Sequence, residues 1–208
     1  MTYRAVEVLK SCDLILAEDT RQTGKLLKHY EIGTRMMAFH MNNEHRVVEH
    51  VIEELEHKTM AICSDAGTPG ISDPGFLLVR ACVEQGIKVE ALPGATAIIP
   101  AIVASGLPCD SFVFEGFLPH KKGKQTAIQK IENETRTVIY YESPHRILKT
   151  LKMMQELLGE DRKVVLAREL SKKFEEYLRG TTTELVAHFE EHPAKGEMVL
   201  MVGGVNIE

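Results

Sequence analysis

A glycine- and proline-rich loop, residues 64–75 (SDAGTPGISDPG), combines the features of a ligand-binding wall. It follows residues 59–63, an apolar run typical of a buried parallel strand, and open α/β sheets bind their ligands at the carboxyl ends of such strands. Its charged residues are Asp65 and Asp73, with no lysine or arginine, whereas a phosphate cradle combines backbone N–H groups with a cation. The loop therefore suits a neutral or cationic ligand, although a strand-to-helix turn without a ligand has the same composition.

Two further strand-to-helix corners carry side chains that could do chemistry. Residues 93–97 (PGATA) are small enough to open a slot for a flat group such as a nucleobase, but a tightly packed helix start explains them more simply. Residues 141–146 (YESPHR) gather a phenol, a carboxylate, an imidazole and a guanidinium. Glu142 or His145 could act as a general base and Arg146 could hold a phosphate, or the corner could be a capping serine before a solvated helical turn.

Other polar positions have more ordinary alternatives. Residues 19–21 (DTR) follow the first apolar run and could line the same cleft, and Glu169 ends another such run. A basic cluster, either a solvated loop or a contact for a phosphodiester backbone, is formed by Lys121, Lys122 and Lys124. Residues 40–46 hold two histidines without further ligands, so we expect no metal site.

Composition places the chain among ordinary globular proteins. Its 208 residues are 44% hydrophobic and 26% charged, which excludes collagen, coiled coil and intrinsic disorder. The net charge of −5 argues against non-specific duplex binding. No apolar run approaches the ~20 residues of a membrane span and no signal pattern opens the chain, so we expect a cytoplasmic protein. The cysteines lack metal-ligand spacing and are expected to be reduced core thiols: Cys12, Cys63, Cys82 and Cys109.

Alternating strand and helix patterns predict an α/β fold with parallel βαβ units. Strands are expected at 12–17, 59–63, 87–92, 137–141, 163–168, 174–178 and 198–202. Helices are expected at 3–9, 20–30, 42–57, 76–85 and 94–104, in the stretch that ends at 133, and from Pro144 to 158. A change of character near 114–119 predicts two α/β domains, residues 1–114 and 115–208. Because the chain opens in a helix-like segment, we expect that a first strand is missing.

Six motifs occur in the order found in one known family. They are residues 17–21 (AEDTR), 64–75, 93–97, 141–146, 167–170 (AREL) and 195–198 (KGEM). Over essentially its whole length the chain closely resembles the ribosomal RNA small subunit methyltransferase I family of the tetrapyrrole methylase superfamily. The resemblance implies a two-domain α/β fold, a homodimer, and S-adenosylmethionine-dependent 2′-O-methylation of a cytidine in small-subunit ribosomal RNA. It places the cofactor in the cleft between the domains.

The resemblance also assigns residues to that cofactor. They are Ser64, Asp65, Ala66, Gly67, Thr68, Pro69, Ile71 and Asp73, then Ala95, Thr96 and Ala97, then Phe117 and Leu118, and finally Glu169, Gly196, Glu197 and Met198. Family members begin with a strand and a glycine-containing loop that are absent from this sequence.

On the acceptor side, a ribose 2′-hydroxyl is a poor nucleophile until a base takes its proton. We expect Glu142 or His145 near that proton, with Arg146 and the lysine cluster (Lys121, Lys122, Lys124) on the RNA backbone.

Two other functions fit the same features less well. A small-molecule methyltransferase of tetrapyrrole rings would share the cleft but would need a wide apolar trough. A non-catalytic RNA-binding assembly factor would keep the fold and bind no cofactor. The cation-free loop argues against a nucleotide-phosphate enzyme.

Overall fold

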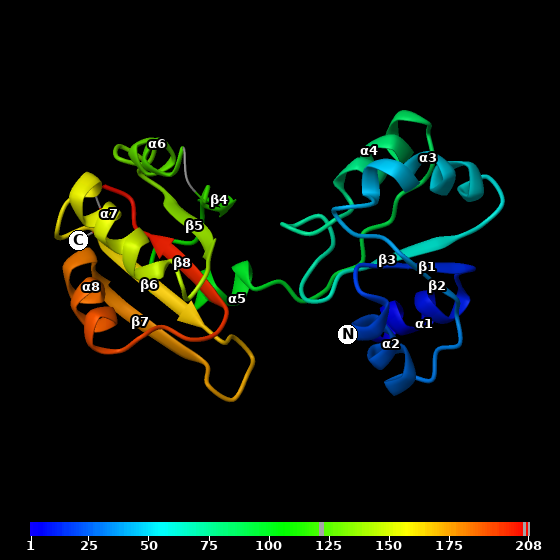
Figure 1. Cartoon of the computed structure of the whole chain (residues 1–208), viewed down its shortest axis with the longest axis horizontal. Coiled ribbons are helices and arrows are strands. Elements are labelled where there is room, and N and C mark those ends of the chain that lie inside the picture. Colours follow the sequence, from blue (N-terminus) through cyan, green and yellow to red (C-terminus); the bar gives the residue numbers. More distant parts are fainter. Residues whose placement is uncertain (121–122, 206, 208) are drawn as a thin grey trace. The chain divides into compact units, whose positions relative to one another are not determined.

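The computed structural model describes residues 1–120, 123–205 and 207, which form two compact units, Met1–Thr96 and Ala97–Glu208 (Figure 1). The division falls after Thr96, earlier in the chain than the expected boundary near 114–119. The reason is visible in α5 (Ile98–Val103), whose Ile98, Ala101 and Ile102 pack against strands of the second unit. Arg179 of that unit also donates hydrogen bonds to the carbonyl groups of residues 104 and 105.

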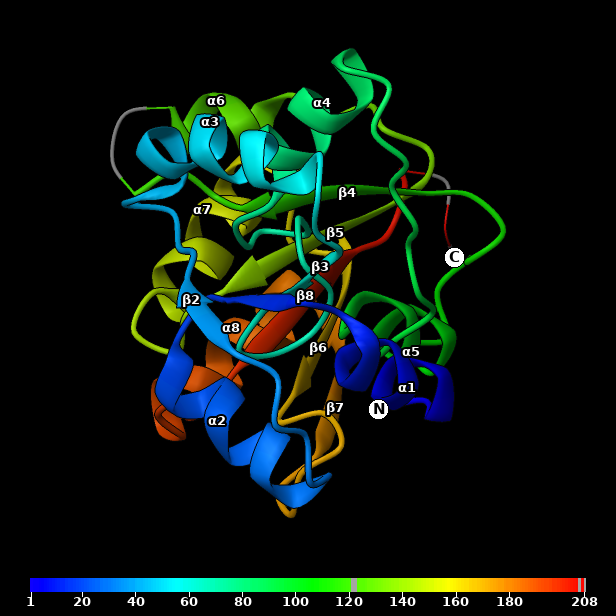
Figure 2. The same cartoon turned by 90° about the vertical axis from the view of Figure 1, so that its right-hand side faces the viewer.

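Unit 1 is built on a three-stranded parallel sheet in the order β2-β1-β3. The strands are β1 (Leu14–Ala17), β2 (Met36–Ala38) and β3 (Met60–Cys63). Helices α1 (Tyr3–Ser11) and α2 (Thr20–His29) cover one face, and α3 (Glu44–Leu55) and α4 (Phe76–Glu84) cover the other (Figures 1 and 2). The strand period of two sends Ile15 to the first face and Leu16 to the second, so both faces are apolar.

Unit 2 contains a five-stranded mixed sheet in the order β4-β5-β8-β6-β7. Its strands are β4 (Phe112–Phe117), β5 (Thr137–Glu142), β6 (Lys163–Arg168), β7 (Glu176–Thr181) and β8 (Met198–Val202), and only β4 and β5 pair in parallel. Helices α6 (Lys124–Gln129), α7 (Ile147–Leu158) and α8 (Thr182–Glu191) cover the face that carries Val138, Tyr140, Leu166 and Leu200. Helix α5 covers the opposite face.

The expected α/β fold is confirmed, with local corrections. Residues 87–92 are not a strand, because no ladder of backbone hydrogen bonds joins them to a neighbouring strand among the described residues. Helix α7 begins at Ile147 and not at Pro144, since a turn closed by hydrogen bonds to the Ser143 carbonyl precedes it. Strands β2 and β4 and helix α8 were not expected. Helix α8 begins with a capping box between Thr181 and Glu184.

The thiols are all free, but they do not all lie in the core. Cys82 is buried, Cys12 and Cys63 are half-buried, and Cys109 is exposed in the loop before β4, so the expectation of four core thiols is wrong for Cys109. Burial raises the pKa of Cys63 to about 11. Among the described residues no helix has the length and apolar character that a membrane crossing requires.

Unit 2 also shows where a glycine is required. A Cβ atom on Gly204 would lie 2.0 Å from the carbonyl oxygen of Thr135, so the two backbone segments touch. We expect Gly204→Ala to lower the melting temperature by several degrees, because overpacking costs roughly 1–3 kcal/mol. Gly33→Ala is the matched control, since a Cβ there meets nothing within 4 Å. Equal melting temperatures in calorimetry would show that the contact relaxes at no cost.

Candidate functional site

The loop expected to bind the cofactor, residues 64–75 (called the cofactor loop below), follows β3 and is joined to the end of β1 by two reciprocal hydrogen bonds. The backbone N–H of Asp19 donates to Asp65 Oδ1 at 3.1 Å, and the N–H of Asp65 donates to Glu18 Oε2 at 3.0 Å. Each loop therefore supplies a carboxylate that satisfies an N–H of the other. This arrangement holds the two strand ends in register at the carboxyl edge of the sheet.

The far end of the cofactor loop is held by a buried glutamate. Glu44 of α3 accepts hydrogen bonds from the N–H groups of Gly75 (3.0 Å) and Leu77 (3.1 Å), and so caps the start of α4. Gly67 and Gly70 have φ values of 83° and 82°, a region that glycine enters without strain. The loop is thus a preformed wall.

A second contact joins this wall to the segment before α5. The Thr68 hydroxyl donates to the carbonyl oxygen of Ala95 at 2.9 Å. The structure therefore brings together the unit 1 part of the expected cofactor set, the loop residues with Ala95 and the adjoining Thr96.

The electrostatics of the wall favour a cation. Burial, and after it the charge of Glu18, raises the pKa of Asp73 to about 6, with Asp65 adding to the shift and a hydrogen bond from Ser64 opposing it. A carboxyl group among carboxylates gains a counter-charge when a positively charged ligand binds. The chemistry of this donor set fits a sulfonium or ammonium group and disfavours a phosphate.

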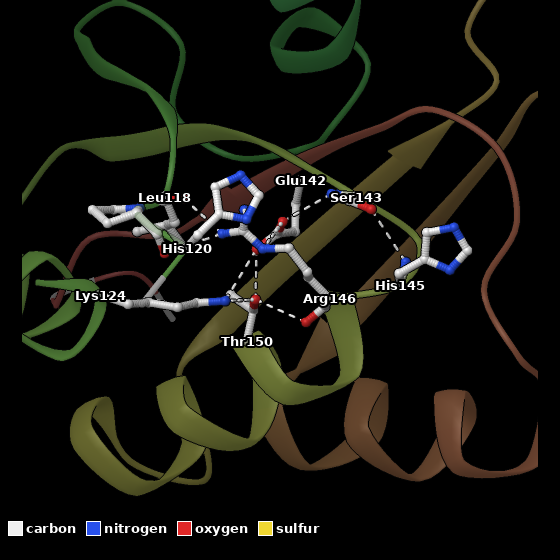
Figure 3. Close-up of polar contacts among 9 residues, drawn as sticks. Leu118, His120, Lys124, Glu142, Ser143, His145, Arg146 and Thr150 are labelled. Atoms are coloured by element: carbon white, nitrogen blue, oxygen red, sulfur yellow. Dashed lines mark hydrogen bonds and ion pairs between the residues drawn. The ribbon is translucent and has the colours of Figure 1, made fainter. Parts of the chain in front are cut away.

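In unit 2, the corner after β5 is organised by a buried carboxylate. Glu142 is 2% exposed, and Figure 3 shows the groups that converge on it. Its Oε2 accepts from the Thr150 hydroxyl at 2.6 Å and from Lys124 Nζ at 3.3 Å, and its Oε1 accepts from the Ser143 N–H at 2.8 Å and pairs with Arg146 Nε at 3.2 Å. Lys124 also contacts the Thr150 hydroxyl. Burial lowers the pKa of Lys124, and the charge of Glu142 opposes that shift.

Arg146 fastens the segment after β4 to this corner. Its guanidinium donates to the carbonyl oxygens of Leu118 (2.6 Å) and Pro119 (3.3 Å) and contacts His120 Nδ1 at 3.2 Å (Figure 3). Because a guanidinium has no acceptor, Nδ1 of His120 must be the acceptor in this contact.

These placements bear on three of the expected roles. Glu142 and Lys124 are both buried within unit 2, at 2% and 6% exposed. Arg146 is committed to loop carbonyls and to Glu142. His145 is exposed at the same corner, with its N–H bonded to Ser143 Oγ at 3.3 Å. The expected RNA contacts Lys121 and Lys122 lie outside the described residues.

Glu169 and the expected cofactor residues at 196–198 form one turn. Glu169 adopts a left-handed φ of 49°, and its Oε1 accepts from the N–H of Glu197 (2.9 Å) and from Lys172 (3.0 Å). These contacts, with the N–H of Glu197 the largest, lower the pKa of Glu169. A Cβ on Gly196 would lie 2.5 Å from Cγ of Glu169, so this close approach requires glycine.

The other expected cofactor residues of unit 2 differ in exposure. Leu118 and Met198 are buried in its hydrophobic core. Phe117 is exposed, with its ring 5.4 Å from that of Tyr141, and Ala97 precedes α5. The described residues hold no cluster of histidine, cysteine and acidic side chains that could ligate a metal.

Several residues that hold the loops in place were not identified from the sequence. Glu18 and Glu44 bond loop N–H groups, Thr150 completes the buried network, and His120 lies against Arg146. The sequence contains a pattern that could have identified two of these residues. Glu44 directly follows Asn43 at a helix start, and Thr150 lies one helical turn after Arg146.

Comparison with known proteins first identifies the broad class of protein to which the chain belongs. Residues 1–186 match the family model of the Tetrapyrrole (Corrin/Porphyrin) Methylases. The fold is similar to that of a diphthine synthase crystal structure (TM-score 0.76, 12% identity, covering 100% of this chain and 86% of that one). It is also similar to a uroporphyrin-III C-methyl transferase from Thermus thermophilus complexed with S-adenyl homocysteine (TM-score 0.64, 16% identity, covering 98% and 90%).

Curated relatives identify the family within this class. A ribosomal RNA small subunit methyltransferase I from Synechocystis is 49% identical over 210 residues, covering 100% of this chain and 75% of the relative. One from Escherichia coli O157:H7 is 51% identical over 208 residues, covering 98% and 73%. The chain belongs to the ribosomal RNA small subunit methyltransferase I family, a branch of the tetrapyrrole methylases.

The buried network around Glu142 yields a stability prediction. Glu142→Gln leaves the Lys124 ammonium buried without its carboxylate, and breaking a buried pair in this way costs about 3 kcal/mol. We expect calorimetry to show a clearly lower melting temperature, partly restored when Lys124→Met is added. Glu156→Gln, on the exposed side of α7, is the control and should leave the melting temperature unchanged. If both glutamine variants melt together, the network does not stabilise unit 2.

Proposed function

We propose that this protein transfers a methyl group from S-adenosylmethionine to the 2′-oxygen of a cytidine ribose in small-subunit ribosomal RNA. The observation that carries the proposal is the acidic, cation-free cofactor loop at the carboxyl edge of a parallel sheet, in a chain about half identical to ribosomal RNA methyltransferases. The loop explains the choice of a cationic cofactor, and the relatives support the choice of RNA.

When bound, S-adenosylmethionine supplies an electrophilic methyl group on a positively charged sulfur. The preformed wall, residues 64–69 with Ile71 and Asp73, supplies close-approaching backbone and a carboxylate whose ionised form a cation stabilises. Ala95, Thr96 and Ala97 extend the wall. Phe117, Leu118, Glu169 and the turn at 196–198 are the contributions of unit 2. Rigidity matters here because aligning the acceptor oxygen with the methyl group is the main catalytic task.

His145 is the group we propose for the ribose proton. It is the exposed titratable side chain of the 141–146 corner, whereas Glu142 is enclosed. The network of Glu142, Lys124 and Arg146 positions that corner and the segment after β4, and Lys121 and Lys122 follow on this segment as RNA contacts. From the family resemblance we also propose a homodimer that acts in the cytoplasm, and light scattering at micromolar concentration checks the dimer.

The competing functions lose support from the comparisons. The porphyrinoid and diphthine enzymes share the fold at 12–17% identity, whereas the ribosomal RNA methyltransferases share about half of the residues. A non-catalytic assembly factor has no need for a preformed wall suited to a cation.

Mass spectrometry of ribosomal RNA tests the proposal. Cells without the gene should lack one 2′-O-methylcytidine in the small-subunit RNA, and a plasmid copy of the gene should restore it. A His145→Gln copy should restore much less, because glutamine cannot take up the ribose proton.

A control and two adverse outcomes accompany this experiment. A His188→Gln copy, changed on α8 far along the sequence, should restore the methyl group fully. An unchanged methylation pattern in the deletion strain would refute the proposed function. Full restoration by His145→Gln would refute only the role of His145.

The pKa of Asp73 gives a separate test of the cofactor site. At pH 5 most Asp73 is protonated, and at pH 7.5 nearly all is ionised, because its pKa is about 6. We therefore expect the affinity for S-adenosylmethionine to rise by up to about tenfold between these pH values. Calorimetry on Asp73→Asn should show weaker binding without that rise, and Asp110→Asn, on an exposed loop of unit 2, should behave as wild type. An identical pH profile in Asp73→Asn would remove Asp73 from the site.

A further inference from the structure

Helix α2 carries a one-sided cationic stripe in a chain whose net charge is −5. Its ten residues, TRQTGKLLKH, contain no aspartate or glutamate. Arg21, Lys25 and Lys28 recur at the spacing i, i+4, i+7 and fall within about 60° of one another around the helix axis. The buried side chains of the helix are Thr23 and Leu27, so the stripe faces away from the core.

The lysines of this stripe lack counter-charges. Arg21 pairs with Asp19, but within the described parts of the chain Lys25 contacts only Gln22 Oε1 (2.9 Å) and Lys28 has no carboxylate within 4.0 Å. Two cations on the neighbouring helices of unit 1 have acidic partners. Arg4 of α1 pairs with Glu90, and Arg80 of α4 lies 3.9 Å from Glu84. Unneutralised charge on one face is the electrostatic footprint of a polyanion site.

The stripe adjoins the cofactor loop. A shallow hollow of about 360 Å³ is lined by Ser64 and Asp65 of the loop and by five residues of α2, Gln22, Thr23, Lys25, Leu26 and His29. The start of α2 is joined to the same loop, because the N–H of its N-cap, Asp19, donates to Asp65. A polyanion on the stripe would thus lie beside the wall proposed for the methyl donor.

We infer that α2 is an RNA-binding surface, on which Lys25 and Lys28 contact successive phosphates and the hollow receives a base or ribose of the same strand. This inference rests on the proposed function. From Arg21 to Lys28 the helix rises about 10 Å, which matches about three nucleotides of a stacked strand. Leu26 and His29 offer the apolar and aromatic surface on which unpaired bases stack.

The test is a double variant, Lys25→Ala/Lys28→Ala, with Lys10→Ala/Lys58→Ala as the matched control. The control lysines are exposed in unit 1 but precede β1 and β3, at the opposite edge of the sheet. The acceptor is the small ribosomal subunit purified from cells that lack the gene, and KM and kcat are measured at several salt concentrations. We expect the KM of the α2 variant to rise about tenfold and its log–log salt slope to fall by about 1.5. Its kcat, its affinity for S-adenosylmethionine and its melting temperature should stay unchanged.

Other results of these measurements would overturn either the inference about α2 or the proposed function. A KM and salt slope equal to those of the control would overturn the inference. So would a changed molar mass in light scattering, which would make α2 an interface between copies. If the wild-type protein transfers no methyl group, the proposed function fails, and anisotropy of a fluorescent single-stranded RNA still tests α2 alone. Equal RNA affinity of wild type and α2 variant in that assay would reject the surface.

Discussion

Carboxylates that accept backbone N–H groups are the interaction on which the functional loops depend. Glycine-rich loops have few side chains to pack, so hydrogen bonds must hold their shape. Glu18 and Asp65 connect the ends of β1 and β3 through hydrogen bonds, and Glu44 caps the start of α4. Glu142 and Glu169 do the same for loops of unit 2. Charge-assisted hydrogen bonds contribute roughly 1.5–3 kcal/mol each, enough to order a short loop.

The charged residues that hold the backbone of the site in place are therefore different from those that can contact a ligand. The 141–146 corner is rich in ionisable groups, yet Glu142 and Arg146 are occupied by the protein itself. Their neighbour His145 keeps its side chain in solvent because the turn before α7 points it outward. In unit 1, Asp73 is the contrasting case, since the neighbouring charges that shift its pKa are the carboxylates of Glu18 and Asp65.

Much of this organisation could be predicted from the sequence, for identifiable reasons. Buried apolar runs such as 163–168 and 198–202 predict β6 and β8 to the residue, because a buried strand needs continuous apolar sequence. Residues 87–92 have the same pattern and are not a strand, since strand formation also requires a partner. Lys124 follows two other lysines and a glycine, a context typical of a solvated loop. Its burial depends on the packing of α6 against α7, which no local pattern encodes.

The orientation of the stripe on α2 has an evolutionary consequence. Because its side chains point away from the core, substitutions there leave the packing of the sheet undisturbed, and under the inferred role of α2 they would change the affinity for RNA. Under that role, lineages would adjust their affinity for a ribosomal target by exchanging single surface residues, while the loop proposed for the methyl donor would be constrained by its backbone geometry. One face of α2 would then vary while the adjoining loop changed little.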